Sequence, residues 1–521
     1  MKTLKRREFL KVAGLAGAGL VAAACDGLKL PATATPAGPA ASPSPSAVPP
    51  TPIEVTAAVR PSPAVSPLAK KPVRLVQWDA WDAAGAWFDE EIQRFQQTYP
   101  WIVIERIRQD DMPAALQQAR QARALPDLYF GGPAPISQFE SKQWLCTPLS
   151  DFADFADFKA IFPSPDLDFA PGSNVIDGKA YTAPREMRTG YRQVTFVNSN
   201  LFEHYGIAEL PTNDVEFVEA CRKIAQDSSG AAYGYGNGFA TGWMNALFEW
   251  LGARSLKVGG RDWRESGSQY VRNPAYQNLL EMLSALAADG LILPESYTAG
   301  ASELRALFAD NRVAVIHGEM DAVAGWKQSH PEFSNYTLLP PLLLNGPQQF
   351  ACYAPPGITG TPLYISNQSK HPEEAWLWFK WLHLPECGQR WVKAGHGLSI
   401  FLENQRPELF ADPIWQDYIR LNNELTRVEP FPAARKLACN RVNVQPVETS
   451  YASLVQMVYD YWLPGDDIPP ALEKLAADSD TNWHAALAEA QRDGVEVTQD
   501  DFIFADWNPL EDYFPQQAKT E

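Results

Sequence analysis

Carboxylates and aromatic rings that follow short apolar runs are the residues of this chain most suited to chemistry. Trp78, Trp81 and Asp82 follow one such run, and Glu319 and Asp321 follow another. Ligands of open α/β sheets bind beyond the carboxyl ends of strands, so the first group is a candidate site. Aromatic faces beside carboxylates can hold a molecule that carries both C–H faces and hydroxyls. Two facing carboxylates could instead cleave a glycosidic bond.

The signatures of common enzymes are missing from the sequence. It contains no GxSxG, no HExxH and no phosphate-cradling GxxxxGK[ST] pattern. A glycoside-cleaving enzyme would need Asp82 together with Glu186 or Glu319 as its facing carboxylates. We therefore predict that the protein is not an enzyme, and a hydrolase built on those carboxylates stays an alternative.

One stretch near the C-terminus has the spacing of a calcium loop. Asp478, Asp480, Asn482 and Glu489 lie at EF-hand ligand positions, but Trp483 stands where the sharp turn requires glycine. The seven histidines form no ligand cluster, and no two cysteines lie within four residues of each other, so a zinc-type CxxC pair is excluded. We predict no metal and no cofactor.

The first 25 residues have the layout of an export signal. Arg6 and Arg7 lie in a basic cluster that resembles a twin-arginine signal, and a short apolar run leads from it to Cys25. The run is shorter than the ~20 residues that cross a bilayer. Because Ala22–Cys25 resembles a lipoprotein processing site, we expect residues 1–25 to act as the signal and Cys25 to carry a lipid. Cleavage without a lipid is the alternative.

Residues 26–70 are dominated by Pro, Ala, Ser and Thr. Such a segment cannot bury enough apolar surface to offset the entropy of ordering it. Proline-rich chain extends by roughly 3 Å per residue, so the segment could hold a folded body up to ~100 Å from a membrane. We predict a disordered tether.

The five cysteines beyond Cys25 leave the disulfide pattern open. Outside the cytoplasm one or two disulfides are possible, with an odd thiol left over. Cys221 lies in an apolar helical pattern and is expected to be a buried thiol.

The chain is acidic, with a formal net charge of -18. Phosphate backbones are bound by basic patches, so this charge argues against a nucleic-acid partner. It also argues against broad electrostatic adhesion to anionic lipid.

Hydrophobic periodicity in the body alternates between strand and helix. Phe88, Ile92, Phe95 and Tyr99 form one buried helical stripe. Strands are expected at 73–76, 102–107 and 127–130, with the second helix at 113–124. This βαβαβ order predicts a parallel sheet with right-handed crossovers.

Further elements follow along the chain. Asn213 and Glu216 form the start of a helix in the manner of a capping box. The later expected elements are helices at 273–288, 301–308 and from Pro372, and a strand at 313–316. The acidic tail, residues 496–521, is rich in aromatic rings and is expected to pack on the body.

Several short segments, in order, resemble the extracellular solute-binding proteins of carbohydrate ABC importers, the maltodextrin-binding type. The matching segments are Val73–Trp78, Phe95–Pro100, Pro126–Leu128, Asp177–Pro184, Phe196–Gly206, Phe308–Gly318 and Ser369–Trp376. They extend over roughly residues 72–490, so the signal, the tether and the tail lie outside the resemblance.

The resemblance implies an α/β fold of the type II periplasmic-binding-protein class. Two lobes with parallel-dominated sheets, flanked by helices, would enclose a cleft. Transferred to this chain, residues 71–186 and 361–410 would form lobe 1, and residues 187–360 and 411–495 would form lobe 2. The lobes of such proteins close on their ligand by a hinge.

The resemblance also implies a set of ligand-binding residues. Asp82 matches the family's hydroxyl-binding acid, and Phe130 occupies a family aromatic position. The full expected set is Trp78, Trp81, Asp82, Phe130, Arg185, Glu186, Trp243, Glu319, Asp321, Tyr353 and Tyr451. The family often has an aromatic after the strand that ends at Gly318, and this chain has Glu319 and Met320 there instead. Glu319 and Asp321 could therefore serve a different hydroxyl pattern or a positively charged ligand.

The expected function is the substrate-binding subunit of an ABC importer. It would capture a mono- or oligosaccharide or a polyol in the interlobe cleft and deliver it to permease subunits. We expect a monomer at the cell surface or in the periplasm, anchored to the membrane through Cys25. The alternatives are a secreted carbohydrate-active enzyme that uses cleft carboxylates and a ligand-sensing accessory lipoprotein.

Overall fold

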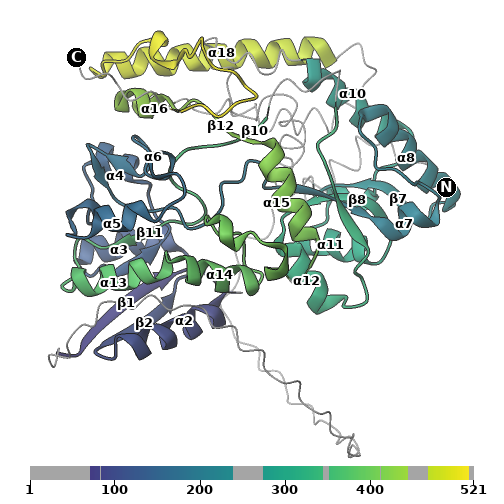
Figure 1. Ribbon diagram of the computed structural model, residues 1–521. Coiled ribbons are helices and arrows are strands. Elements are labelled where there is room, and N and C mark those ends of the chain that lie inside the picture. The colour runs from purple at the N-terminus through teal and green to yellow at the C-terminus, as the bar shows by residue number, and fades with distance from the viewer. Residues whose placement is uncertain are drawn as a thin grey trace, which may run out of the picture. The chain divides into compact units, whose positions relative to one another are not determined.

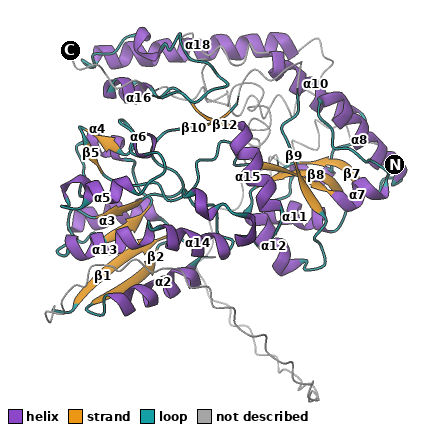
Figure 2. Ribbon diagram, viewed as in Figure 1, coloured by secondary structure: helices purple, strands orange, loops and turns teal. Residues whose placement is uncertain are grey.

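The computed structural model describes residues 71–81, 84–238, 274–343, 351–410, 412–443 and 468–514. Contacts divide the chain into two units, Met1–Leu68 and Ala69–Glu521, and every described residue lies in the second. The strands gather in two groups with helices around each (Figure 2). Within the described ranges, no helix combines the length and the apolar character that a membrane span requires.

The first sheet has four strands in the order β11-β3-β1-β2. They are β1 (Val73–Asp79), β2 (Ile102–Arg108), β3 (Leu128–Phe130) and β11 (Leu363–Ile365). Strand β1 pairs in parallel with both β2 and β3, which confirms the parallel pairing predicted from the βαβαβ order.

The second sheet also has four strands, in the order β7-β8-β6-β9. They are β6 (Val194–Asn198), β7 (Tyr233–Gly236), β8 (Val313–Gly318) and β9 (Tyr336–Leu339). Strand β7 pairs in parallel with β8, but β6 is antiparallel to both β8 and β9. The expectation of mainly parallel pairing therefore holds for the first sheet and is wrong for the second.

Each sheet contains one reversed strand, and in each case that strand directly follows a segment that comes from the other sheet. Strand β6 follows residues 184–193, and β11, which is antiparallel to β3, follows residues 352–362. Strands that follow a helix of their own sheet keep one direction. A local hydrophobic pattern predicts that a segment is a strand but contains no information on the direction of that strand in its sheet. The antiparallel directions of β6 and β11 could therefore not be predicted.

Helices α2 and α13 pack on the first sheet through a shared aromatic core. Phe88 and Phe95 are buried there, as the stripe on α2 predicted, and Trp376 and Trp378 of α13 are buried with them. The helices of this part are α2 (Gly85–Thr98), α3 (Met112–Ala122), α4 (Pro135–Ser141), α5 (Phe155–Ala160), α6 (Pro165–Asp168), α13 (Pro372–Leu382) and α14 (Pro385–Lys393), with a 3₁₀ turn η1 (Leu149–Asp151) and a hairpin of β4 (Val175–Ile176) and β5 (Lys179–Ala180).

The second sheet has its own core, in which α8 and α10 pack by leucine and aromatic side chains. Leu279, Leu280, Leu283 and Leu286 are buried, and so is Cys221, as predicted for that thiol. The helices of this part are α7 (Ser199–His204), α8 (Asp214–Asp227), α10 (Pro274–Ala288), α11 (Ala301–Ala309), α12 (Asp321–Ser329) and α15 (Ile414–Leu425), with the 3₁₀ turn η4 (Pro294–Tyr297).

The start of α8 confirms the predicted cap with one change of partner. The Asn213 side chain accepts a hydrogen bond from the Glu216 amide at 3.0 Å. The Glu216 carboxylate accepts from the Thr212 amide at 2.8 Å, not from the amide of the cap residue. Both groups still satisfy amides that a helix start leaves unpaired.

The chain links the two cores and the C-terminal part through four described segments, 184–193, 352–362, 394–410 and 426–431, which we call the connecting segments. Two of them carry strands β10 (Cys352–Ala354) and β12 (Thr426–Val428), which pair in parallel. The Gly190 amide donates to Thr426 Oγ1 at 2.9 Å, and the Met187 amide donates to the Leu398 carbonyl at 3.1 Å. The connecting segments are thus hydrogen-bonded to one another.

The C-terminal part consists of α16 (Pro432–Arg435), α18 (Ile468–Arg492) and the residues after it (Figure 1). The short turns η5 (Leu402–Asn404), η6 (Pro407–Leu409), η7 (Leu437–Arg441) and η9 (Gln499–Phe502) complete the described elements. Phe502, Phe504 and Trp507 are buried, which confirms that the described aromatic tail packs on the body. The stretch with calcium-loop spacing lies within α18 and is helical throughout.

Candidate functional site

A pocket of about 580 Å³ is lined by residues that follow strands of both sheets, by residues of helices α11, α12, α14 and α15, and by the connecting segments. Trp81 comes shortly after the end of β1, and Glu319 comes directly after the end of β8. Glu186 of segment 184–193 lines the same pocket. Because ligands of α/β sheets bind at the carboxyl ends of strands, this pocket is the candidate functional site.

Trp81 is held in place by the last residue of β1 and by β2. The Trp81 amide donates to Asp79 Oδ1 at 3.0 Å, and Arg106 Nη2 donates to the Trp81 carbonyl at 2.6 Å. Arg106 also donates two hydrogen bonds to the fully buried Asp79 carboxylate, at 2.7 and 2.8 Å. The backbone that carries the Trp81 ring is therefore fixed by charge-assisted hydrogen bonds.

Trp391 of α14 forms the neighbouring part of the wall. Its ring meets Trp81 edge to face at 5.8 Å and Trp87 of α2 at 4.9 Å. Its indole Nε1 is buried and has no hydrogen-bond partner among the described residues. The Trp391 side chain lines the pocket.

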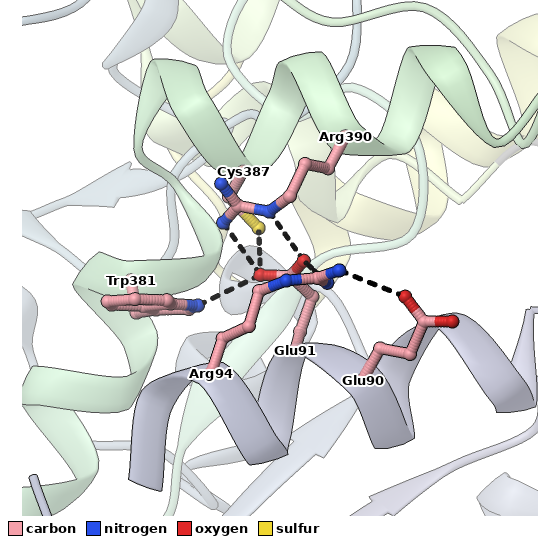
Figure 3. Close-up of polar contacts among 6 residues, drawn as sticks. All are labelled: Glu90, Glu91, Arg94, Trp381, Cys387 and Arg390. Carbon is pink, nitrogen blue, oxygen red and sulfur yellow. Dashed lines mark hydrogen bonds and ion pairs between the residues drawn. The ribbon is translucent and has the colours of Figure 1, made fainter. Parts of the chain in front are cut away.

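Helix α14 is fixed to α2 by the buried Glu91 carboxylate, which binds Arg390, the residue before Trp391 (Figure 3). Arg390 donates two hydrogen bonds to Glu91, at 2.6 and 2.7 Å, and Trp381 Nε1 donates a third at 3.1 Å. Arg94 adds a further bond at 2.8 Å. Burial by itself raises the pKa of Glu91, but the hydrogen bonds and charges of these partners outweigh it and hold the pKa below its ordinary value.

Arg185 and Glu186 lie where segment 184–193 leaves the first sheet. Arg185 is buried, with its guanidinium 4.4 Å from the Trp391 ring centroid and 5.3 Å from that of Phe130. It donates to Glu186 across a long 3.5 Å contact, and its Nε and Nη1 have no partner among the described residues. Burial raises the pKa of Glu186, with Arg185 and Arg192 acting in the opposite direction.

On the side of the second sheet, the pocket wall combines an ion pair with aromatic rings. Arg305 of α11 donates to both oxygens of Asp321, at 2.7 and 3.1 Å, and both residues line the pocket. Trp326 Nε1 donates a hydrogen bond to the Arg305 carbonyl oxygen at 3.0 Å. Helix α15 adds the rings of Trp415 and Tyr418, so aromatic faces come from this side as well.

His396 completes the described wall near Trp391. Its ring lies 4.9 Å from that of Trp391 and lines the pocket. Burial, and then the charge of Arg185, lower the pKa of His396. A neutral imidazole can both donate and accept a hydrogen bond.

The structure brings four of the expected site residues to this pocket and places four others elsewhere. Trp81, Glu186, Glu319 and Asp321 line it. Phe130 and Arg185 lie behind the aromatic wall, Trp78 packs with Tyr129 and Met112, and Tyr353 is buried in the core beside Trp507. Asp82, Trp243, Tyr451 and Cys25 fall outside the described residues.

Several pocket residues were not expected from the sequence, above all Trp391, Trp415, Tyr418, Arg192 and Arg305. None of them follows a strand, and no motif marks them. Trp391 and Trp415 lie on amphipathic helices that begin with proline or directly after it, a signal that predicts the helices but not the faces that reach the pocket. The five described cysteines are all buried free thiols, so none of them forms a disulfide within the described ranges.

Comparisons with solved structures support the fold. The sugar-binding protein MalE from Xanthomonas citri has a TM-score of 0.57 at 17% identity, with 82% of this chain and 100% of that chain covered. RafE from Streptococcus pneumoniae has a TM-score of 0.57 at 14% identity, with 80% and 99% covered. An ABC transporter solute-binding protein from Thermotoga lettingae, bound with α-D-tagatose, has a TM-score of 0.54 at 20% identity, with 80% and 100% covered. These likenesses show a type II periplasmic-binding-protein fold, as expected.

A search of curated proteins finds no significant match. The family description "Bacterial extracellular solute-binding protein" matches residues 79–386, which is more than half of the chain. The match includes Trp81, Glu186, Glu319 and Asp321 of the pocket and every strand of both four-stranded sheets except β1, of which it includes only Asp79. The chain therefore belongs to the bacterial extracellular solute-binding protein family.

Proposed function

We propose that this protein binds an uncharged sugar or related polyol in the pocket between its two sheets. The observation that carries the proposal is the combination of aromatic rings and paired polar groups around one cavity. The rings of Trp81, which follows β1, and of Trp391 on α14 form one wall of the pocket. The rings of Trp415 and Tyr418 on α15 line the pocket from the side of the second sheet. Sugars present flat C–H faces and a rim of hydroxyls, so they are matched by rings together with fixed donors and acceptors.

The charges of the pocket favour a neutral ligand over a cation. Both terminal nitrogens of the Arg305 guanidinium donate to Asp321, so the negative charge of this carboxylate is already balanced by Arg305. Arg192 also lines the pocket, and the Arg185 cation lies against Trp391, whose π-face would otherwise attract a positive ligand. Glu319 remains as an exposed carboxylate that can accept hydrogen bonds from hydroxyls.

The two sheets with their helices correspond to two lobes that would close on the ligand. Residues 71–186 and 361–410 form the first lobe in this proposal, and 187–360 and 411–495 form the second. The pocket is lined from both, so a ligand that contacts both walls would favour a closed conformation over an open one.

The family of this chain and the sugar ligands named for similar proteins support delivery of the ligand to an ABC permease. The Xanthomonas citri relative is described as sugar-binding, and the Thermotoga lettingae relative holds α-D-tagatose. We extend sugar capture and delivery to this chain as a monomeric subunit of an importer. A lipid on Cys25 and the tether 26–70 would keep it near the permease.

A thermal-shift screen of the purified protein tests the binding function. The probes are α-D-tagatose, acarbose, stachyose and sorbitol, with spermidine and a dipeptide as non-sugar controls. A true ligand at 100 times its dissociation constant stabilises the fold by ~2.7 kcal/mol. A shift with a sugar or polyol and none with the controls is expected. Stabilisation by spermidine alone would contradict the proposal.

The same samples distinguish binding from catalysis. The sugar that produces the largest shift is incubated with the protein and then analysed by chromatography. Recovery of the unchanged sugar is expected of a binding protein. Turnover that disappears in Glu186→Gln or Glu319→Gln would support the enzyme alternative instead.

A further inference from the structure

The segment that follows α18 runs back across the strands that join the two sheets (Figure 1). We call residues 499–514 the C-terminal strap. The family match ends at residue 386, so the strap lies outside it. Its contacts fall on three different parts of the body, and each is made by hydrogen bonds or buried rings.

The first set of contacts joins the strap to β12. The Tyr513 amide donates to the Val428 carbonyl at 2.8 Å, and the Val428 amide donates to Asp512 Oδ1 at 2.7 Å. Arg427 Nε donates to the Leu510 carbonyl at 2.9 Å. The strap therefore binds the backbone of a strand within connecting segment 426–431.

The second set joins the strap to β10 and to the core of the second sheet. The Tyr353 hydroxyl donates to the Pro509 carbonyl at 2.8 Å, and its ring lies 5.5 Å from that of Trp507. Trp507 and Phe504 belong to the buried core that contains α8 and α10. The strap is thus anchored in the second lobe and attached to segment 352–362.

The third set leads toward the first lobe through α16. Arg435 donates to the Ile503 carbonyl at 2.7 Å and lies 3.6 Å from the centroid of the Phe504 ring, and Lys436 pairs with Asp501 at 3.0 Å. The α16 backbone in turn meets the first lobe closely, since a Cβ on Gly172 would lie 2.5 Å from the Ala433 carbonyl. Leu437 packs on the cluster that contains the first-sheet residue Tyr364.

We propose that the C-terminal strap is a conformational brake that restricts the movement of the two lobes. Hinge motion requires changes of φ and ψ in the connecting segments. The strap is bonded to two of those segments, is anchored in one lobe and reaches the other through α16. Rotation of the lobes would change the backbone of these two segments or break the contacts of α16 with the first lobe, so the strap, which is bonded to both segments and to α16, favours the conformation in which all of these contacts form. The proposal rests on the two-lobe hinge of the proposed function.

Distances between spin labels on the two lobes, measured without ligand, test the brake. Labels are placed at exposed positions by Gln97→Cys on α2 and Glu219→Cys on α8. Cys25→Ala removes the one native thiol outside the described residues, and the five described thiols are buried. Because no sugar is added, a failure of sugar binding leaves this result interpretable.

Two strap variants are compared with one control. The first variant ends the chain after Thr498, and the second is Arg435→Ala with Asp512→Ala, which leaves the buried rings in place. Asp478→Ala is the control, because the Asp478 carboxylate pairs with Lys474 of the same helix, four residues earlier. A broader or shifted distance distribution is expected in both strap variants and not in the control. If truncation prevents folding, the double variant decides alone. A double variant that is folded by circular dichroism and keeps the parental distribution would overturn the brake.

Discussion

At the scale of single residues, the positions of the pocket-lining rings depend on residues that do not line the pocket themselves, such as Arg106 and Glu91. Trp81 could be predicted from its place after β1, because strand ends mark ligand sites in α/β sheets. Trp391 could not, since its position follows from the packing of α14 on α2, about 300 positions earlier in the sequence. Glu91 lies in a charged run that suggests an exposed helix face, yet its side chain is fully buried.

Replacing Glu91 should destabilise the protein in a pH-dependent manner. Glu91→Gln leaves Arg390 and Arg94 without their shared carboxylate, and we expect a loss of about 2–3 kcal/mol in the free energy of unfolding at pH 7. The folded-state pKa of Glu91 lies below its ordinary value of 4.5. The stabilisation is therefore full above pH 4.5 and fades as the pH falls through the folded-state pKa.

Urea unfolding of wild type and variant from pH 7 down to pH 3 measures this difference. Glu90→Gln is the control, because Glu90 pairs with the same Arg94 but its side chain is 61% exposed. An exposed pair contributes little, so this control should change the unfolding free energy by less than about 0.5 kcal/mol. Equal effects of the two substitutions would mean that the buried network of Figure 3 does not stabilise the fold.

At the scale of elements, the strands and helices with strong periodicity were predicted, and the direction of two strands was not. Helices α2, α8, α10 and α13 carry clear apolar stripes or caps. Strands β6 and β11 are reversed because each follows a connecting segment from the other sheet. That information is held in tertiary contacts between connecting segments, which no local pattern records.

Close packing of the connecting segments makes Gly190 sensitive to substitution. A Cβ on Gly190 would lie 2.7 Å from the carbonyl carbon and oxygen of Cys352, which are backbone atoms of β10. Gly190→Ala should therefore lower the free energy of unfolding by about 1–3 kcal/mol. Chemical denaturation measures the change.

Gly325→Ala provides the matched comparison for that prediction. Gly325 lies within α12, and a Cβ there meets no atom within 4 Å. Alanine is preferred over glycine in a helix by about 0.5–1 kcal/mol, so this variant should be more stable than wild type. If Gly190→Ala were as stable as Gly325→Ala, the close contact between segments 184–193 and 352–362 would be refuted.

At the scale of the whole molecule, the sequence predicted the fold class from the order of short family-like segments. Two sheets with separate cores and a pocket lined from both agree with that class. The set of pocket residues was only partly predicted, because helices from distant parts of the chain complete the wall. The signal and the tether lie outside the described residues, so the membrane anchor stays a prediction from sequence.

The anchor prediction is tested by partition between detergent and water. Protein isolated from expressing cells should enter the detergent phase if Cys25 carries a lipid, because each buried methylene adds about 0.8 kcal/mol to membrane binding. Cys25→Ala should move the protein to the aqueous phase without a change in its circular dichroism. A wild-type protein found in the aqueous phase would point to cleavage without lipidation.

Calorimetric titration of the pocket variants tests the central claim most directly. The sugar selected by the thermal-shift screen is titrated into Trp81→Ala and Arg305→Ala, which alter opposite walls. Trp144→Ala and Arg222→Ala are the controls: Trp144 stacks on Tyr181, Arg222 binds Asp289 through two nitrogens as Arg305 binds Asp321, and neither lines this pocket. We predict at least a tenfold loss of affinity, about 1.4 kcal/mol, in each wall variant and wild-type affinity in both controls. Wild-type affinity in both wall variants would contradict sugar binding between the two sheets.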